Sequence, residues 1–243
     1  MAAYADARLL ELWESGLVQH PLDRALTLLI AAEPGETRAN LAALPVGSLD
    51  ERLLRVYQAA IGEQLNCLAA CPQCGAQLEF SLEAGRLAAV GAPPADKAMT
   101  LTQGGYTIQF RLPTSLDLAA AAANPHGQNA REELIAGCIV EARLGEVRVS
   151  PAELPEGLIQ ALENSLAEND PQSERLLELV CAACGHAWQE TLDIAGFLWA
   201  QVAARARRML AEVHSLAGAY GWSEAEILGM SAQRRAAYME LIG

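Results

Sequence analysis

Two Cys-x-x-Cys-Gly elements constrain the fold of this chain more than any other feature of its sequence. They span Cys71–Gly75 and Cys181–Gly185, and strand-like sequence flanks each of them. Two intervening residues let both sulfurs of such a turn converge, and the glycine that follows accommodates left-handed backbone. Tetrahedral zinc takes four ligands, which two such turns supply. We therefore predict one structural Zn2+ ion per chain, held by Cys71, Cys74, Cys181 and Cys184.

The wide separation of the two elements predicts an insertion. Between Cys74 and Cys181 lie 106 residues, so the chain must leave the site and return to it. So long an insertion is compatible with a shared site, because each doubling of loop length adds only about 0.6 kcal/mol to the free-energy cost of closing the loop. A structural zinc ion contributes about 10–16 kcal/mol in small fingers, and we expect it to fasten the two halves of the chain together.

The predicted fold is α+β and mostly helical, with a split zinc ribbon made of two Cys-x-x-Cys-Gly knuckles and a mixed α/β insert between them. Its parts follow in chain order. We expect N-terminal helices over 1–65, the ribbon halves at 66–85 and 176–193, the inserted mixed α/β subdomain over 86–175, and C-terminal helices over 194–243.

Capping residues mark several helix boundaries. Ser48-Leu-Asp-Glu51 fits a capping box at the start of a helix that ends at Gly62. Asp193 is expected to cap a long helix whose apolar residues recur at helical spacing until Gly221. Ser223-Glu-Ala-Glu226 fits a second capping box.

Within the insert, the pattern predicts one hairpin and three helices. Thr100–Leu112 alternates about a Gly104-Gly105 turn, and Thr114 or Asp117 can cap the alanine-rich helix that follows. Helices are predicted from about Ala130 to Arg143 and near 156–168.

The charge balance excludes some partners. The chain carries 30 acidic and 17 basic residues, a formal net charge of −13. So acidic a chain is poorly suited to binding nucleic-acid phosphates or an anionic membrane, and we expect neither partner. No apolar stretch approaches the roughly 18–20 residues of a membrane span. The start of the sequence lacks the basic and apolar regions of an export signal, so we expect the protein in the bacterial cytoplasm.

The sequence gives less support to other roles for the cysteines. A thioredoxin-like pair lies at a helix N-terminus, whereas strand-like sequence follows both pairs here. Disulfides are not expected in a reducing cytoplasm. Cys67 and Cys138 are most simply core residues, with Cys67 a reserve ligand, and His186 is placed beside the site rather than in it. Because a four-cysteine zinc site has no open position, and no catalytic motif is present, we expect no enzymatic activity.

Five segments of the sequence together resemble a known family. They are Leu44–Leu54, Cys71–Gly75, Phe110–Leu118, Cys181–Trp188 and Glu212–Glu224. The resemblance is to baseplate proteins of the T-even-phage type, which serve contractile phage tails and related contractile injection systems. It covers roughly residues 40–243, and Tyr220–Glu224 is its most distinctive part.

The resemblance implies a role in protein–protein assembly. The family includes baseplate hub components and hub-assembly factors, so it implies a chaperone or component that contacts hub or spike proteins, with the assembled particle as a second location. Two alternatives remain open from the residues: a dithiol redox enzyme, and a zinc-ribbon adaptor of transcription or translation machinery.

The C-terminal segment supplies a candidate partner surface, because arginine and aromatic residues commonly anchor interfaces. Ser231 is expected to open a last helix with Arg234 and Arg235 outside and with Tyr238, Leu241 and Ile242 inward. The candidate residues are Arg205, Arg208, Trp222, Arg234, Arg235 and Tyr238.

Overall fold

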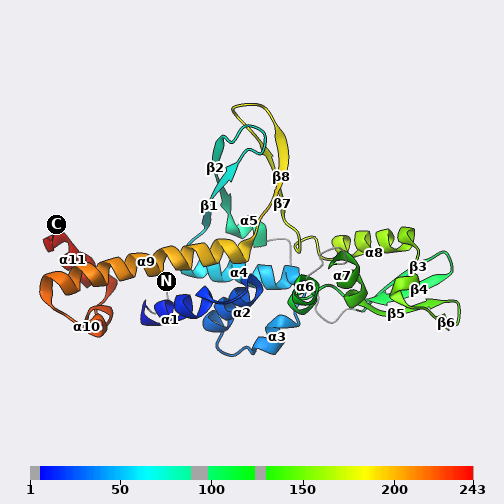
Figure 1. Cartoon of the computed structure of the whole chain (residues 1–243), viewed down its shortest axis with the longest axis horizontal. Helices are drawn as coiled ribbons and strands as arrows, with labels where there is room; N and C mark the ends of the chain where they lie inside the picture. Colours follow the sequence, from blue (N-terminus) through cyan, green and yellow to red (C-terminus); the bar gives the residue numbers. More distant parts are fainter. Residues whose placement is uncertain (1–5, 89–97, 124–129, 243) are drawn as a thin grey trace.

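The computed structural model describes residues 6–88, 98–123 and 130–242. The molecule is elongated, with a helical body, an insert lobe at one end, a small helical cap at the other end, and an arm of two hairpins that stands away from the body (Figure 1). The fold is mixed α+β, with many helices and three small antiparallel sheets among the described residues. No helix within those residues is both long enough and apolar enough to cross a membrane.

Helices from both ends of the chain build the body around one core. Its elements are α1 (Asp6–Leu17), α2 (Pro21–Ala32), α3 (Arg38–Ala42), α4 (Val46–Ala60) and the long α9 (Ile194–Tyr220). Leu29 of α2, Leu53 of α4 and Leu198 of α9 are fully excluded from solvent within this core. Trp199 packs on α1 at Gly16, where any side chain would collide with its ring. The N-terminal and C-terminal helices are therefore joined by apolar packing, with no need of a metal.

Two β-hairpins form the arm. β1 (Gln64–Ala70) pairs with β2 (Gln77–Glu83), and β7 (Leu176–Val180) pairs with β8 (Ala187–Thr191), each pair as its own two-stranded sheet. The short helix α5 (Ala84–Ala88) lies at the base of the arm (Figure 1). Two-stranded hairpins are only marginally stable alone, so the arm needs support at its tip as well as at its base.

The insert lobe is a four-stranded antiparallel sheet with helices. Its strands are β3 (Met99–Gln103), β4 (Tyr106–Phe110), β5 (Ile139–Leu144) and β6 (Val147–Arg148), and its helices are α6 (Ser115–Ala122), α7 (Ala130–Cys138), the 3-10 turn η1 (Pro151–Glu153) and α8 (Glu156–Asn169). Ile108, Phe110 and Leu162 centre its separate core. The cap consists of α10 (Glu224–Leu228) and α11 (Ala232–Ile242), which pack on the end of α9.

Several local predictions are confirmed. The hairpin turns at Gly104-Gly105, and the capping box of α6 uses both Thr114 and Asp117. Asp193 accepts a hydrogen bond from the N–H of Gly196 and so caps α9, which ends at Gly221 in a left-handed conformation with φ of 69°. Ser223 and Glu226 form the second box. The helix predicted near 156–168 is α8.

The helix predicted from Ala130 to Arg143 is wrong in its second half. α7 ends at Cys138, and Ile139–Leu144 forms β5, paired with β4. The register of that pairing shifts at Gln109/Phe110. Pairing with a distant strand outweighs the helical spacing of Leu134, Ile135, Cys138 and Ile139, and the β-branched residues at 139 and 140 favour the strand locally.

The capping box predicted at Ser48–Glu51 is also wrong. α4 begins at Val46, two residues before Ser48, so that Ser48 and Glu51 are buried inside its first turns. The N-cap residue Pro45 makes no side-chain hydrogen bond. Instead, the carboxylate of Asp170, from the end of α8, accepts the N–H of Gly47 at 2.9 Å.

This contact fastens the insert lobe to the body. Asp170 is 1% exposed, and its carboxylate occupies the space that a side chain at Gly47 would need. Ser115 adds a second link by donating to the carbonyl of Ala42 at 3.1 Å. Asp170, 123 positions away in the sequence, thus accepts the free N–H at the start of α4 that a neighbouring N-cap residue accepts in most helices.

Replacing Asp170 with alanine is expected to lower the free energy of unfolding by about 1–3 kcal/mol, because a buried N–H at the start of α4 loses its acceptor. Asp170→Asn is the matched control, since its amide oxygen still accepts the bond, and it should lose less. Urea unfolding followed by circular dichroism measures both. Equal losses in the two variants would contradict the capping role.

Candidate metal centre

Each Cys-x-x-Cys-Gly element forms the tight turn at the tip of one hairpin. In the first, the N–H of Gly75 donates to the carbonyl of Cys71 at 2.9 Å, and the N–H of Cys71 donates to the carbonyl of Ala76 at 2.9 Å. The second repeats this pattern with Gly185, Cys181 and His186, at 2.9 and 2.8 Å. The glycines have φ of 72° and 74°, in the left-handed region that side chains disfavour.

The two turns meet at the top of the arm (Figure 1) and bring four sulfurs together. The Sγ atoms of Cys71 and Cys184 are 3.7 Å apart, and those of Cys74 and Cys181 are 3.6 Å apart. All four lie within 4.8 Å of one another. Sulfurs bound to one zinc ion at about 2.3 Å stand about 3.8 Å apart in a tetrahedron, whereas a disulfide requires about 2.05 Å. The donor set and its spacing fit a tetrahedral thiolate-binding metal ion.

The four cysteine sulfurs differ in their burial and in their hydrogen bonds from the backbone. Cys71 and Cys181 are buried, whereas Cys74 and Cys184 are exposed. Hydrogen bonds from the backbone N–H groups of Cys184 and Ala183, opposed by desolvation, lower the pKa of Cys181 to about 7. The backbone N–H of His186 favours the thiolate of Cys184, but local desolvation and the neighbouring sulfurs of Cys74 and Cys181 raise its pKa to about 12. A cation that binds all four thiolates must therefore displace protons from this cluster.

One known protein family matches most of this chain. The family described as T4 bacteriophage base plate protein matches residues 22–199. This match covers nearly three quarters of the sequence. The chain belongs to the T4 base plate family. No curated protein and no solved structure matches it.

Membership in the T4 base plate family confirms the resemblance and refines its extent. The match includes both knuckles, the insert lobe and α2, so it begins upstream of residue 40, where the resemblance in sequence starts. It ends at residue 199, near the start of α9, so Glu212–Glu224 lies outside it. The family supports a structural role in a baseplate, and such a role implies contact with other baseplate proteins.

The remaining cysteines lie apart from the four. Cys67 is half-buried on β1 opposite Phe80, and its sulfur contacts the carbonyl of Leu65 at 3.6 Å. Cys138 is fully buried at the end of α7, and burial raises its pKa to about 12. His186 stacks against Trp188, with the rings nearly parallel and their centroids 6.2 Å apart.

The predicted partner residues separate into two groups. Arg205, Arg208 and Arg235 line a groove along α9. Trp222 and Tyr238 form an aromatic cluster with Tyr220 at the end of α9; Trp222 lies 4.4 Å from Tyr220 and 4.8 Å from Tyr238 between ring centroids. Arg234 lies over the ring of Tyr238 at 5.7 Å. Sequence spacing alone did not show this division.

The predicted orientation of the last helix needs correction. Arg235 is 2% exposed rather than outward, because α11 folds back on α9 and Arg235 donates to Glu212 at 3.1 Å and to the carbonyl of Met230 at 2.8 Å. Leu241 and Ile242 are exposed rather than inward, because they lie outside the small core shared by α9, α10 and α11.

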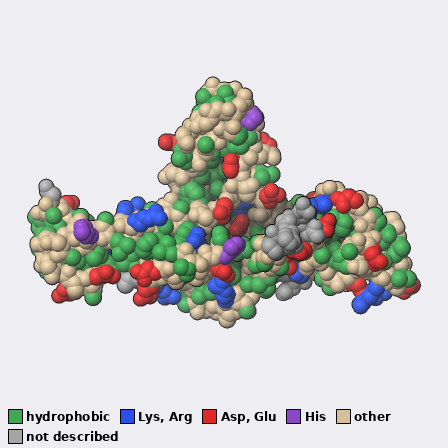
Figure 2. All heavy atoms as spheres, in the orientation of Figure 1, with side chains coloured by type: hydrophobic (Ala, Val, Ile, Leu, Met, Phe, Trp, Pro, Cys, Tyr) green, Lys and Arg blue, Asp and Glu red, His purple; other side chains and the backbone are tan. Residues whose placement is uncertain are grey.

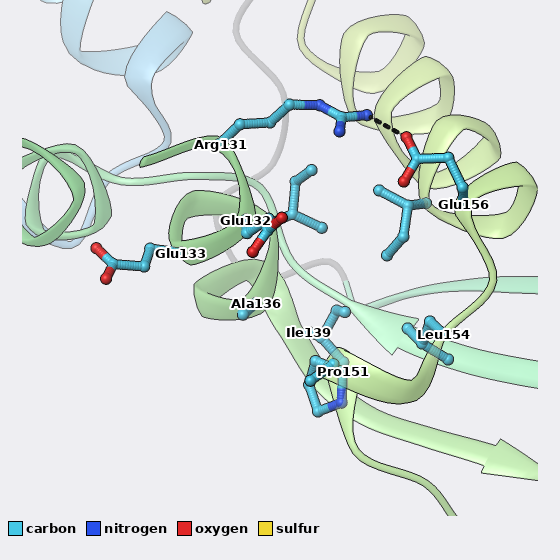
Figure 3. A pocket seen from close by; sticks show the side chains of 11 residues that line it. Arg131, Glu132, Glu133, Ala136, Ile139, Pro151, Leu154 and Glu156 are labelled. Atoms are coloured by element: carbon cyan, nitrogen blue, oxygen red, sulfur yellow. Dashed lines mark hydrogen bonds and ion pairs between the residues drawn. The ribbon is translucent and has the colours of Figure 1, made fainter. Parts of the chain in front are cut away.

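A pocket that the sequence did not indicate lies between α7, η1 and α8 (Figure 3). Its volume is about 360 Å3, and its floor is apolar, with Ile139 and Leu154 among the lining residues. Arg131 at its rim binds Glu156 at 3.1 Å and Glu163 at 2.5 Å. Because Arg131 is held in these ion pairs, the rim is charged, but it does not bring together a nucleophile and a base.

Proposed function

We propose that this protein is a non-enzymatic component or assembly factor of the baseplate hub in a contractile tail or contractile injection system. It acts through protein–protein contacts in the cytoplasm of the producing bacterium, with hub or spike proteins as its partners. The observation that supports this most strongly is the family match over residues 22–199, which covers α2 to α4 of the body, both knuckles and the insert lobe.

Zinc is proposed to stabilise the arm rather than the whole chain. The body and the insert lobe have apolar cores of their own, and the two hairpins are separate sheets whose tips meet at the four sulfurs. A tetrahedral ion there would cross-link the tips and keep the arm upright. This revises the expectation that zinc fastens the two halves of the chain, because packing between α9 and the N-terminal helices already joins them.

The candidate partner surface is proposed at the cap. Trp222 and Tyr238 offer two aromatic rings that meet edge to face, and Arg234 adds a guanidinium; such side chains most often anchor interfaces. Arg235 belongs to the fold of the cap instead, since its guanidinium is buried against Glu212.

The redox alternative has less geometric support. A catalytic dithiol needs an accessible thiolate, commonly at a helix N-terminus. Here both pairs lie in turns between strands, and Cys71 and Cys181 are buried. A zinc-ribbon adaptor would instead be indicated by co-purification of polymerase or ribosome.

Deletion of the gene from a bacterium that produces the particle tests the proposed function. We expect particles without assembled baseplates, restored by the wild-type gene. Recovery of the protein at fixed stoichiometry in purified particles would make it a component; its absence from restored particles would make it an assembly factor. Normal baseplates in the deletion strain would overturn the proposal.

A further inference from the structure

A basic groove runs along α9 between the end of α4 and α11. Arg205, Arg208 and Arg235 line it together with Glu212, and Ile61 and Met209 supply apolar surface, in a volume of about 320 Å3. Arg208 is exposed, whereas Arg235 is tied to Glu212. Figure 2 shows Lys and Arg side chains gathered over α9 between the arm and the cap.

This groove contrasts with the charge of the rest of the chain. α9 carries three arginines and one glutamate, whereas the whole chain has a net charge of −13. A long polyanion such as nucleic acid would be repelled by the surrounding surface. A short acidic element that also offers small side chains fits the groove better, because it meets the arginines without crossing the acidic surface.

The insert lobe presents such an element. α8 contains three glutamates and no basic residue. Its exposed side includes Glu156, Gln160, Asn164, Ala167 and Glu168. At 100° per residue these positions fall within about 120° of the helix circumference, so they form one stripe along α8. Glu156 at one end of the stripe is paired with Arg131, and Glu168 lies at the other end. In Figure 2, Asp and Glu side chains lie over this part of the lobe.

We propose that α8 of a second copy docks in the α9 groove, so that copies of the protein associate head to tail. The two surfaces are complementary in charge, an acidic helix against a groove lined by arginines. They cannot meet within one chain, because α11 and the neighbouring part of α9 lie on the opposite side of the arm from α8 (Figure 1). A contact between two different surfaces leaves one of each free at the ends, and therefore builds rings or filaments rather than an isolated dimer.

Sedimentation velocity of the full-length protein tests this directly. We expect association that increases with concentration up to about 100 μM and weakens at high salt, as contacts between exposed charges do. Arg208→Glu and Glu168→Arg should each weaken association at least about tenfold, because each places like charges across the contact. A mixture of the two variants should associate again, since the groove of one and α8 of the other remain native.

Two matched substitutions away from both surfaces are the controls. Arg8→Glu on α1 and Glu178→Arg on β7 make the same changes in charge at exposed positions and should leave association unchanged. Circular dichroism confirms that all variants are folded. A wild-type protein that remains monomeric throughout, or an equal effect of the control variants, would overturn the proposal. So would a mixture that stays monomeric. None of these outcomes depends on whether the protein acts in a baseplate.

Discussion

Replacing Cys74 with serine is expected to release the metal ion and loosen the arm while the helical body stays folded. Cys74 lies 3.6 Å from Cys181 across the two hairpins, and a three-sulfur site loses a large share of the affinity that a closed tetrahedron provides. Zinc binding contributes about 10–16 kcal/mol in small zinc-finger peptides, so its loss far exceeds the effect of one missing sulfur contact.

Two measurements report the result. Zinc content should fall from one ion per chain to near zero, and hydrogen exchange should rise in β1, β2, β7 and β8 while the centre of α4 and α9 remains protected. Cys67→Ser is the matched control, because Cys67 lies on the same arm but outside the cluster, and it should retain zinc. Global unfolding of the Cys74 variant would contradict the view that the body is held by its own core.

Replacing Leu198 with alanine should destabilise the helical body and leave zinc bound, the reverse of the effect expected for Cys74→Ser. Leu198 is fully buried where α9 meets the N-terminal helices, so the substitution leaves a cavity in the body. We expect the free energy of unfolding to fall by about 2–5 kcal/mol, with zinc still bound in the folded protein. Urea unfolding followed by circular dichroism measures the change.

Leu241→Ala provides the comparison, because Leu241 is 75% exposed on α11. Its effect should stay within about 0.5 kcal/mol. If the two leucine substitutions cost the same, the single core shared by the two ends of the chain would be refuted.

The sequence predicted those features that depend on a few neighbouring residues. The spacing within each Cys-x-x-Cys-Gly element fixes a turn, and two turns with the same donors predicted one shared site despite 106 intervening residues. The structure brings the four sulfurs within 4.8 Å, and zinc as the ion stays a prediction. Asp193 and Gly221 marked the ends of α9 correctly for the same local reason.

Features that depend on distant partners were not predictable in this way. Ile139–Leu144 becomes a strand because β4 lies beside it, and α4 starts at Val46 because Asp170 caps it from the far end of the insert. Arg235 is buried because α11 returns to Glu212. In each case the deciding contact joins residues that no local pattern connects.

Metal analysis combined with X-ray absorption tests the central claim most directly. Protein purified without chelator should contain one zinc ion per chain, surrounded by four sulfurs at about 2.3 Å. A metal-free protein whose knuckle cysteines are cross-linked as cystine, or an ion with mostly oxygen or nitrogen neighbours, would contradict it.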